Sequence, residues 1–95
     1  MSFAIQPGQD GSVRITGRLD AAESEKAGAA LASLQGPLTL DCSDLSYISS
    51  AGLSVILVTF KRLHAQGQTL RLVNVQPNVR NVFTYAGLHR LLQIE

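Results

Sequence analysis

The chain has no tryptophan, one cysteine and few aromatic side chains, and each shortage excludes a class of protein. Aromatic residues make up 5% of the 95 residues, too few for the stacking platforms that bind single-stranded nucleic acid. With Cys42 alone, no intramolecular disulfide can form, which fits a reducing compartment. The 8 basic and 7 acidic residues leave a net charge of +1, so we expect no nucleic-acid partner.

Long apolar runs are absent too. None approaches the ~20 residues that a membrane-spanning helix needs, and the first residues lack the basic and apolar regions of a signal peptide. These absences predict a cytoplasmic protein with no membrane insertion.

Motifs for catalysis are also missing. The chain has no P-loop, no dinucleotide-binding glycine motif and no metal-ligand spacing of histidine and cysteine. Residues 49–54 read Ser-Ser-Ala-Gly-Leu-Ser, which is not the G-x-S-x-G turn of one common class of serine hydrolase. We therefore expect neither an enzyme nor a bound cofactor, and the sequence offers no convergent polar set for a small-ligand pocket.

What the chain has is an aliphatic core and alternating element types. Hydrophobic residues make up 45% of the sequence, enough for one domain over residues 1–95 without disulfide or metal support. Apolar periodicity predicts strands within 3–5, 13–17, 38–42 and 70–73, helices over 21–34, 50–65 and 77–86, and a helical turn, a strand or both over 88–94. This order predicts an α/β fold with a mixed, mostly parallel sheet, an N-terminal hairpin and helices packed against the sheet.

The most informative segment runs from residue 41 to residue 53. A buried strand pattern gives way to acidic and serine residues, and Ser49 and Ser50 then open a long amphipathic helix. Helix N-termini carry unpaired N–H groups and positive dipole charge, which favour an anionic group. From spacing alone, these serines are either a simple N-cap or a site of regulatory phosphorylation.

Three segments together resemble the STAS domain family, and in particular its anti-sigma factor antagonists. The first, LDCSDLSYISSAGL over 40–53, is similar to the family's D-x-S-x-V-x-Y/F-I/M-D-S-S/T/A-G-L motif. The second, GRLD over 17–20, is similar to the family's G-E-L-D. The third, VQPNVRNVFTYAGL over 75–88, resembles its P-x-V-x-x-V-F-x-x-x-G-L segment. The resemblance spans almost the whole chain.

The resemblance implies a partner switch controlled by phosphorylation. The unphosphorylated protein would bind an anti-sigma factor that is also a serine kinase of the GHKL type, which frees the sigma factor. Phosphorylation on Ser50, the position that matches the family's acceptor, would end binding, and a metal-dependent PP2C-type phosphatase would reset the cycle. Alternatives within the family are an accessory subunit of a bacterial lipid-transport ABC system and a scaffold STAS protein.

Two positions depart from the family pattern. Ser49 stands where aspartate is usual, so it is an alternative acceptor beside Ser50, and Arg18 stands where glutamate is common. The expected partner-binding surface surrounds the serines. Asp20 is predicted as an N-cap or part of that surface, Asp44 and Ser46 as turn formers or contacts, and Gly52 as a close-packing residue. The full set expected to bind the partner is Asp20, Asp44, Ser46, Ser49, Ser50, Ala51, Gly52, Leu53 and Ser54.

Overall fold

In the computed structural model, which describes residues 3–8 and 11–95, strands and helices alternate along the chain after an initial strand pair. The described elements are β1 (Ala4–Pro7), β2 (Val13–Leu19), α1 (Ala21–Ala32), β3 (Leu38–Ile48), α2 (Ser50–Ala65), β4 (Leu70–Val73), α3 (Pro77–Tyr85), the 3₁₀ helix η2 (Leu88–Arg90) and β5 (Gln93–Ile94).

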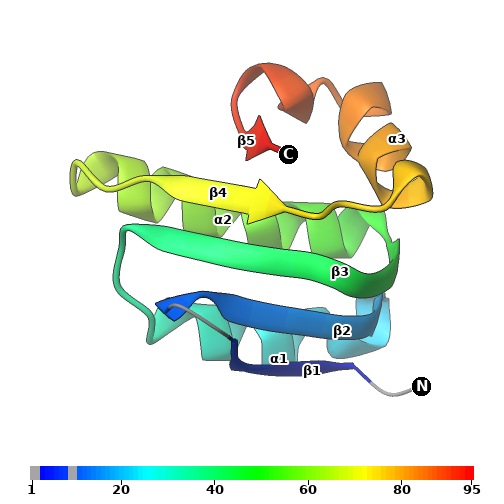
Figure 1. Ribbon diagram of the computed structural model, residues 1–95, viewed down its shortest axis with the longest axis horizontal. Helices are drawn as coiled ribbons and strands as arrows, with labels where there is room; N and C mark the ends of the chain where they lie inside the picture. Colours follow the sequence, from blue (N-terminus) through cyan, green and yellow to red (C-terminus); the bar gives the residue numbers. More distant parts are fainter. Residues whose placement is uncertain (1–2, 9–10) are drawn as a thin grey trace.

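One sheet holds the strands in the order in which they occur in the chain, β1-β2-β3-β4-β5. The β1–β2 pair is antiparallel and the other three pairs are parallel. Helices α1 and α2 lie side by side behind the sheet in Figure 1, whereas α3 lies beyond the carboxyl end of β4. The predicted fold class is thereby confirmed, including the hairpin and the mostly parallel pairing. Residues 9 and 10 of the predicted hairpin turn fall outside the described residues.

The helix boundaries follow from local chemistry. Asp20 accepts a hydrogen bond from the Glu23 amide at 3.2 Å and caps α1, as predicted. Helix α2 spans the predicted range and is followed by Gly67 at φ +72°, a conformation that favours glycine. Pro77 opens α3, where a missing N–H costs nothing.

The core is aliphatic, as the composition predicts. It lies between the sheet and the helices, and α3 closes one end of it with Val79 and Phe83. The largest side chains that are almost wholly buried are Phe83, Ile15, Leu19, Leu31, Leu40, Leu45, Ile56, Leu63, Leu72, Val79 and Cys42. Cys42, a free cysteine, is buried in this core.

Strand β3 is longer than predicted. The sequence indicated a strand that ended at Cys42 and was followed by a turn, but pairing with β2 continues to Leu19↔Ile48. Two register shifts between these strands allow Cys42, Leu45 and Ile48 all to face the core at a spacing of three residues. The tail contains both a helical turn and a short strand, η2 and β5, in agreement with the prediction.

Candidate functional site

Two helix N-termini meet at the carboxyl edge of the central strands. Asp20 follows β2 and caps α1, and Ser49 follows β3 and caps α2. The Ser49 amide donates a hydrogen bond to the Leu19 carbonyl at 2.9 Å, which joins the two strand-to-helix connections. Because both helices begin here, their positive dipole ends lie at the same edge of the sheet.

The two adjacent serines have different roles in this structure. The Ser49 hydroxyl oxygen accepts a hydrogen bond from the Gly52 amide at 3.2 Å, and the residue is half-buried. Ser50 is exposed, and its side chain makes none of the hydrogen bonds found among the described residues. Its backbone carbonyl accepts from the Ser54 hydroxyl at 3.2 Å. The accessible hydroxyl at the start of α2 is therefore that of Ser50.

The first turn of α2 divides into buried and exposed positions. Gly52 is buried, and a Cβ there would lie 2.6 Å from the Leu19 carbonyl oxygen, which confirms its close-packing role. The sequence left Leu53 open between partial exposure and core packing, and in the structure it belongs to the core, with only 9% of its surface exposed. Ala51 is half-buried and Ser54 is exposed. Of this turn, Ser50, Ala51 and Ser54 are available to a partner.

Asp44 and Ser46 are not turn formers, because both lie within β3. Asp44 pairs with Arg14 of β2, and the Ser46 hydroxyl donates to the Gly17 carbonyl at 3.0 Å. These side chains therefore bond across strands rather than to nearby backbone. Asp44 is opposite Thr16, whereas the edge with the serines begins beyond the Leu19↔Ile48 pair. The structure thus does not bring Asp44 to the serines.

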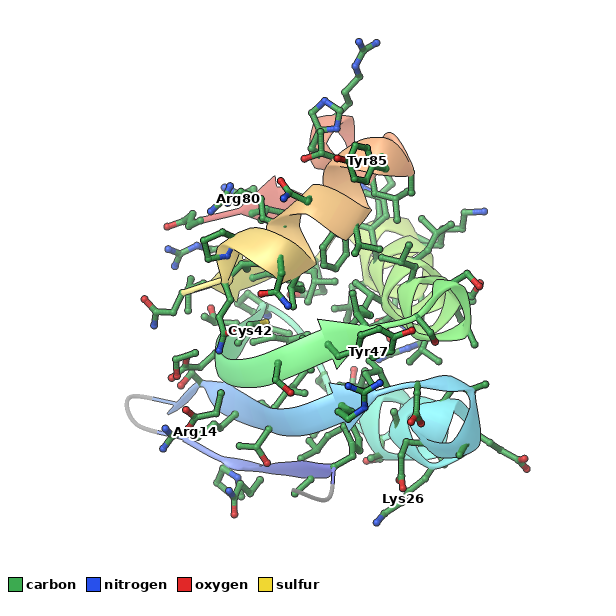
Figure 2. The ribbon with its side chains drawn as sticks, turned by 90° about the vertical axis from the view of Figure 1, so that its right-hand side faces the viewer. Arg14, Lys26, Cys42, Tyr47, Arg80 and Tyr85 are labelled. Carbon is green, nitrogen blue, oxygen red and sulfur yellow. The ribbon has the colours of Figure 1, made fainter. Side chains whose placement is uncertain are left out.

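Sequence reasoning missed a neighbouring pair of residues on the same edge. Arg18 and Tyr47 are opposite each other on β2 and β3, and the Arg18 Cζ lies 4.1 Å from the centroid of the Tyr47 ring. Figure 2 looks onto the carboxyl ends of these strands and shows Tyr47 at the end of β3. The unusual arginine was visible in the sequence, but its partner depends on a strand register that no local pattern revealed.

A polar depression of about 970 Å³ lies elsewhere on the sheet. Its lining includes Arg14, Asp41, Arg71 and Asn74, and neither candidate serine takes part. A hydrogen bond from the Ser43 amide to the Asp41 carboxylate lowers the pKa of that carboxyl below its usual value. These polar side chains come together only through the pairing of β2, β3 and β4, which the sequence pattern did not reveal.

No helix between residues 11 and 95 is long and apolar enough to cross a membrane. Within the part of the chain that the structure describes, no group of three histidine, cysteine, aspartate or glutamate side chains could hold a metal ion.

This architecture is that of an α/β domain with a mixed, mostly parallel sheet, and comparison with known proteins identifies its family. The family model described as "Mlab, STAS domain" matches residues 3–93. The chain therefore belongs to the STAS domain family.

Two curated relatives have names that describe a function. A candidate anti-sigma factor antagonist, BtrV of Bordetella bronchiseptica, is 44% identical over 50 residues, which is 53% of this chain and 43% of that protein. The anti-sigma-B factor antagonist of Bacillus subtilis is 34% identical over 64 residues, 67% of this chain and 59% of that protein. The matches thus span about half the length of these curated relatives.

Solved structures share the fold. A candidate anti-sigma factor antagonist from Thermotoga maritima superposes with a TM-score of 0.79 at 22% identity, over 97% of this chain and 84% of that one. The phosphorylated form of the Bacillus cell fate determinant SpoIIAA gives a TM-score of 0.70 at 22% identity, over 99% and 91% of the two chains. At such identities the likeness establishes the fold alone.

Proposed function

We propose that this protein is an anti-sigma factor antagonist whose binding is controlled by phosphorylation of Ser50. The observation that carries the proposal is the exposed Ser50 hydroxyl at the N-terminus of α2, beside a second helix N-terminus. Family membership and the names of the curated relatives support it. These names do not favour an accessory subunit of a lipid-transport system or a scaffold.

In this switch the chain is a substrate and a binding partner rather than a catalyst. The unphosphorylated form binds an anti-sigma factor that is a GHKL-type serine kinase, and the sigma factor is released. The Ser50 Oγ then attacks the γ-phosphorus of the kinase's ATP. An oxygen–phosphorus bond forms, the bond to the ADP leaving group breaks, and the hydroxyl proton passes to a base of the kinase. A PP2C-type phosphatase hydrolyses the phosphoserine with water and restores the hydroxyl.

The position of Ser50 accounts for a switch that leaves the fold intact. A phosphate adds close to two negative charges, and the dipole of α2 favours that charge at its N-terminus. Because Ser50 makes no side-chain hydrogen bond among the described residues, the modification breaks none of those bonds. The added charge and bulk oppose a partner that covers this surface.

Ser50 is a better acceptor than Ser49 because Ser49 is already engaged as the N-cap. The hydroxyl oxygen of Ser49 accepts the Gly52 amide, and esterification would have to disturb that bond. Asp20 at the cap of α1, together with Ala51 and Ser54 in the first turn of α2, belongs to the accessible part of the expected binding surface. Asp44 and Ser46, farther back on β3, contribute only if the partner also covers the sheet edge.

Mass spectrometry tests the acceptor directly. The protein is incubated with ATP, magnesium and each purified GHKL-type serine kinase of the same organism, and phosphopeptides are mapped. We expect one phosphate, on Ser50, in the wild type and in Ser49→Ala, and none in Ser50→Ala. Phosphate that persists on Ser50→Ala would move the acceptor to Ser49. An unmodified wild type with every kinase would contradict the switch and return attention to the transport and scaffold alternatives.

Binding measurements test the switch. Ser50→Asp places a negative charge at the acceptor, so we expect weaker binding to the kinase than for the wild type, whereas Ser50→Ala binds whether or not ATP is present. Circular dichroism and urea unfolding should show that both variants remain folded. Equal affinities of Ser50→Asp and the wild type would contradict control at this position.

A further inference from the structure

Arg18 and Tyr47 form a preorganised pair on the surface of the sheet edge. They are opposite each other on β2 and β3, and the guanidinium carbon lies 4.1 Å from the centre of the tyrosine ring. Arg18 is exposed and Tyr47 is 36% exposed. A contact of this kind between a cation and an aromatic face is attractive and restricts the arginine side chain.

The guanidinium of Arg18 has no carboxylate partner among the described residues. The described ion pairs are Arg14–Asp44 and Arg71–Glu95. Arg62 differs, because it donates to the carbonyl of Leu31 at the end of α1 and to that of Leu34 just beyond it. The Arg18 side chain makes no hydrogen bond to another described residue, so its contact with Tyr47 leaves the N–H donors available. A planar fork of free donors suits a carboxylate, which it can bind through two hydrogen bonds.

The pair adjoins the candidate acceptor site. The next residue pair along these strands is Leu19↔Ile48, and the Leu19 carbonyl accepts the Ser49 amide at 2.9 Å. Figure 2, which faces the carboxyl ends of the strands, shows Tyr47 at the end of β3. A partner that covers the start of α2 therefore also reaches Tyr47 and Arg18.

We infer that Arg18, held by Tyr47, receives an aspartate or glutamate side chain of the anti-sigma factor and thereby selects its partner. This inference rests on the proposed function. Tyrosine and arginine are the residue types that carry much of the energy of protein interfaces. Like-charge contacts across an interface suppress wrong partners. A partner with a basic group at the corresponding position is rejected.

The same contact explains how a phosphate on Ser50 acts on binding. The partner carboxylate sits at the edge of the sheet where α2 begins. A phosphoserine at that edge adds close to two negative charges, which repel the carboxylate. Phosphorylation thus opposes the charge pair that selects the partner, in addition to any steric effect.

Charge reversal at Arg18 tests the inference. The probe is the purified GHKL-type kinase that phosphorylates Ser50 in the assay above, titrated calorimetrically without nucleotide. We expect Arg18→Glu to weaken binding by about tenfold or more. Arg18→Lys should weaken binding less, because lysine keeps the positive charge but lacks the planar fork of donors. The affinity of Tyr47→Ala should lie between those of the two Arg18 variants. Arg90→Glu is the matched control, because Arg90 is exposed on η2 and the net charge changes equally; its affinity should stay within about twofold.

The outcomes separate this inference from the proposed function. Equal affinities of Arg18→Glu and the wild type, while Ser50→Asp still weakens binding, would overturn the Arg18 contact and leave the switch in place. Tighter binding by Arg18→Glu would mean that the partner presents a cation and would also overturn it. Failure of the wild type to bind or be phosphorylated would instead contradict the proposed function. Restored binding of Arg18→Glu to a kinase variant with one acidic surface residue changed to lysine would identify the partner group.

Discussion

Gly52 shows how one residue without a side chain fixes the start of α2 against the sheet. A Cβ at this position would lie 2.6 Å from the Leu19 carbonyl oxygen and 2.8 Å from the Ile48 side chain. The same Leu19 carbonyl also accepts a hydrogen bond from the Ser49 amide, so it cannot move without disturbing the hydrogen bond that joins the end of β2 to the start of α2. Gly28 of α1 is different, because its nearest neighbour for a Cβ is the Val55 side chain at an ordinary 3.9 Å.

Alanine substitutions at the two glycines should therefore have opposite effects. We expect Gly52→Ala to lower the free energy of unfolding by about 1–3 kcal/mol through overpacking. Gly28→Ala should raise it by about 0.5–1 kcal/mol, because alanine favours the helix interior. Urea unfolding followed by circular dichroism measures both. If Gly52→Ala were as stable as the wild type, the close approach to Leu19 would not be the reason for glycine at this position.

Individual site residues were predictable to the extent that their roles are local. The N-cap role of Asp20 and the placement of Ser49 and Ser50 at a helix start follow from sequence neighbours. Leu53 was ambiguous because its burial depends on how α2 rotates against the sheet. The contact between Arg18 and Tyr47 depends on long-range register, which local patterns do not contain.

At the scale of the element, the start of α2 carries two serine hydroxyl groups with different roles. Ser49 is the N-cap, with extended backbone and an oxygen that accepts from the Gly52 amide. Ser50 is the first helical residue and is exposed. The cap therefore contributes stability, and the first helical position is left for a modification that α2 can accommodate.

Separate alanine substitutions should distinguish these contributions. Ser49→Ala removes the cap, so we expect a loss of about 1 kcal/mol in the free energy of unfolding. Ser50→Ala removes no side-chain hydrogen bond among the described residues and should change stability by less than about 0.5 kcal/mol. Thermal and urea unfolding of the two variants give the comparison. A larger loss for Ser50→Ala than for Ser49→Ala would contradict the assigned roles.

Strand β3 shows which kind of element escapes sequence reasoning. Its first half alternates in a simple way, and this half was predicted. In the second half the core residues Leu45 and Ile48 are three residues apart, and serine and aspartate lie between and before them. That spacing breaks the period of two and looks like a turn, but two register shifts against β2 accommodate it within the sheet. The spacing of the core residues in β3 can therefore be explained only by its pairing with β2.

At the scale of the whole molecule, the alternation of strands and helices was sufficient to predict the mixed sheet. Right-handed crossovers that always step to the next strand place α1 and α2 on the same side, as Figure 1 shows. The other side carries the polar depression that includes Arg14, Asp41 and Arg71, which the sequence did not reveal. These residues come from three neighbouring strands and meet only after the sheet has formed.

The burial of Cys42 makes the stability of the fold depend on pH in the alkaline range. The side chain is fully buried on β3, and this burial raises the pKa of the thiol from 9.0 to about 12. Above the pKa that the Cys42 thiol has in the unfolded chain, the unfolded chain loses a proton that the folded protein keeps. Stability from this group is therefore complete below about pH 9 and falls as the pH rises toward the folded pKa.

We predict that the free energy of unfolding falls by up to about 2 kcal/mol from this thiol between about pH 9 and about pH 10.5. Urea unfolding of the wild type and of Cys42→Ala at both pH values isolates the contribution, because the lysines and tyrosines titrate in both proteins. The variant should start less stable, since a buried group is lost, but its stability should decline less with pH. In the native wild type at neutral pH, a thiol reagent should react with Cys42 only as fast as the protein unfolds, because both burial and the raised pKa suppress the thiolate. Parallel pH dependences of the two proteins would contradict the assignment to Cys42.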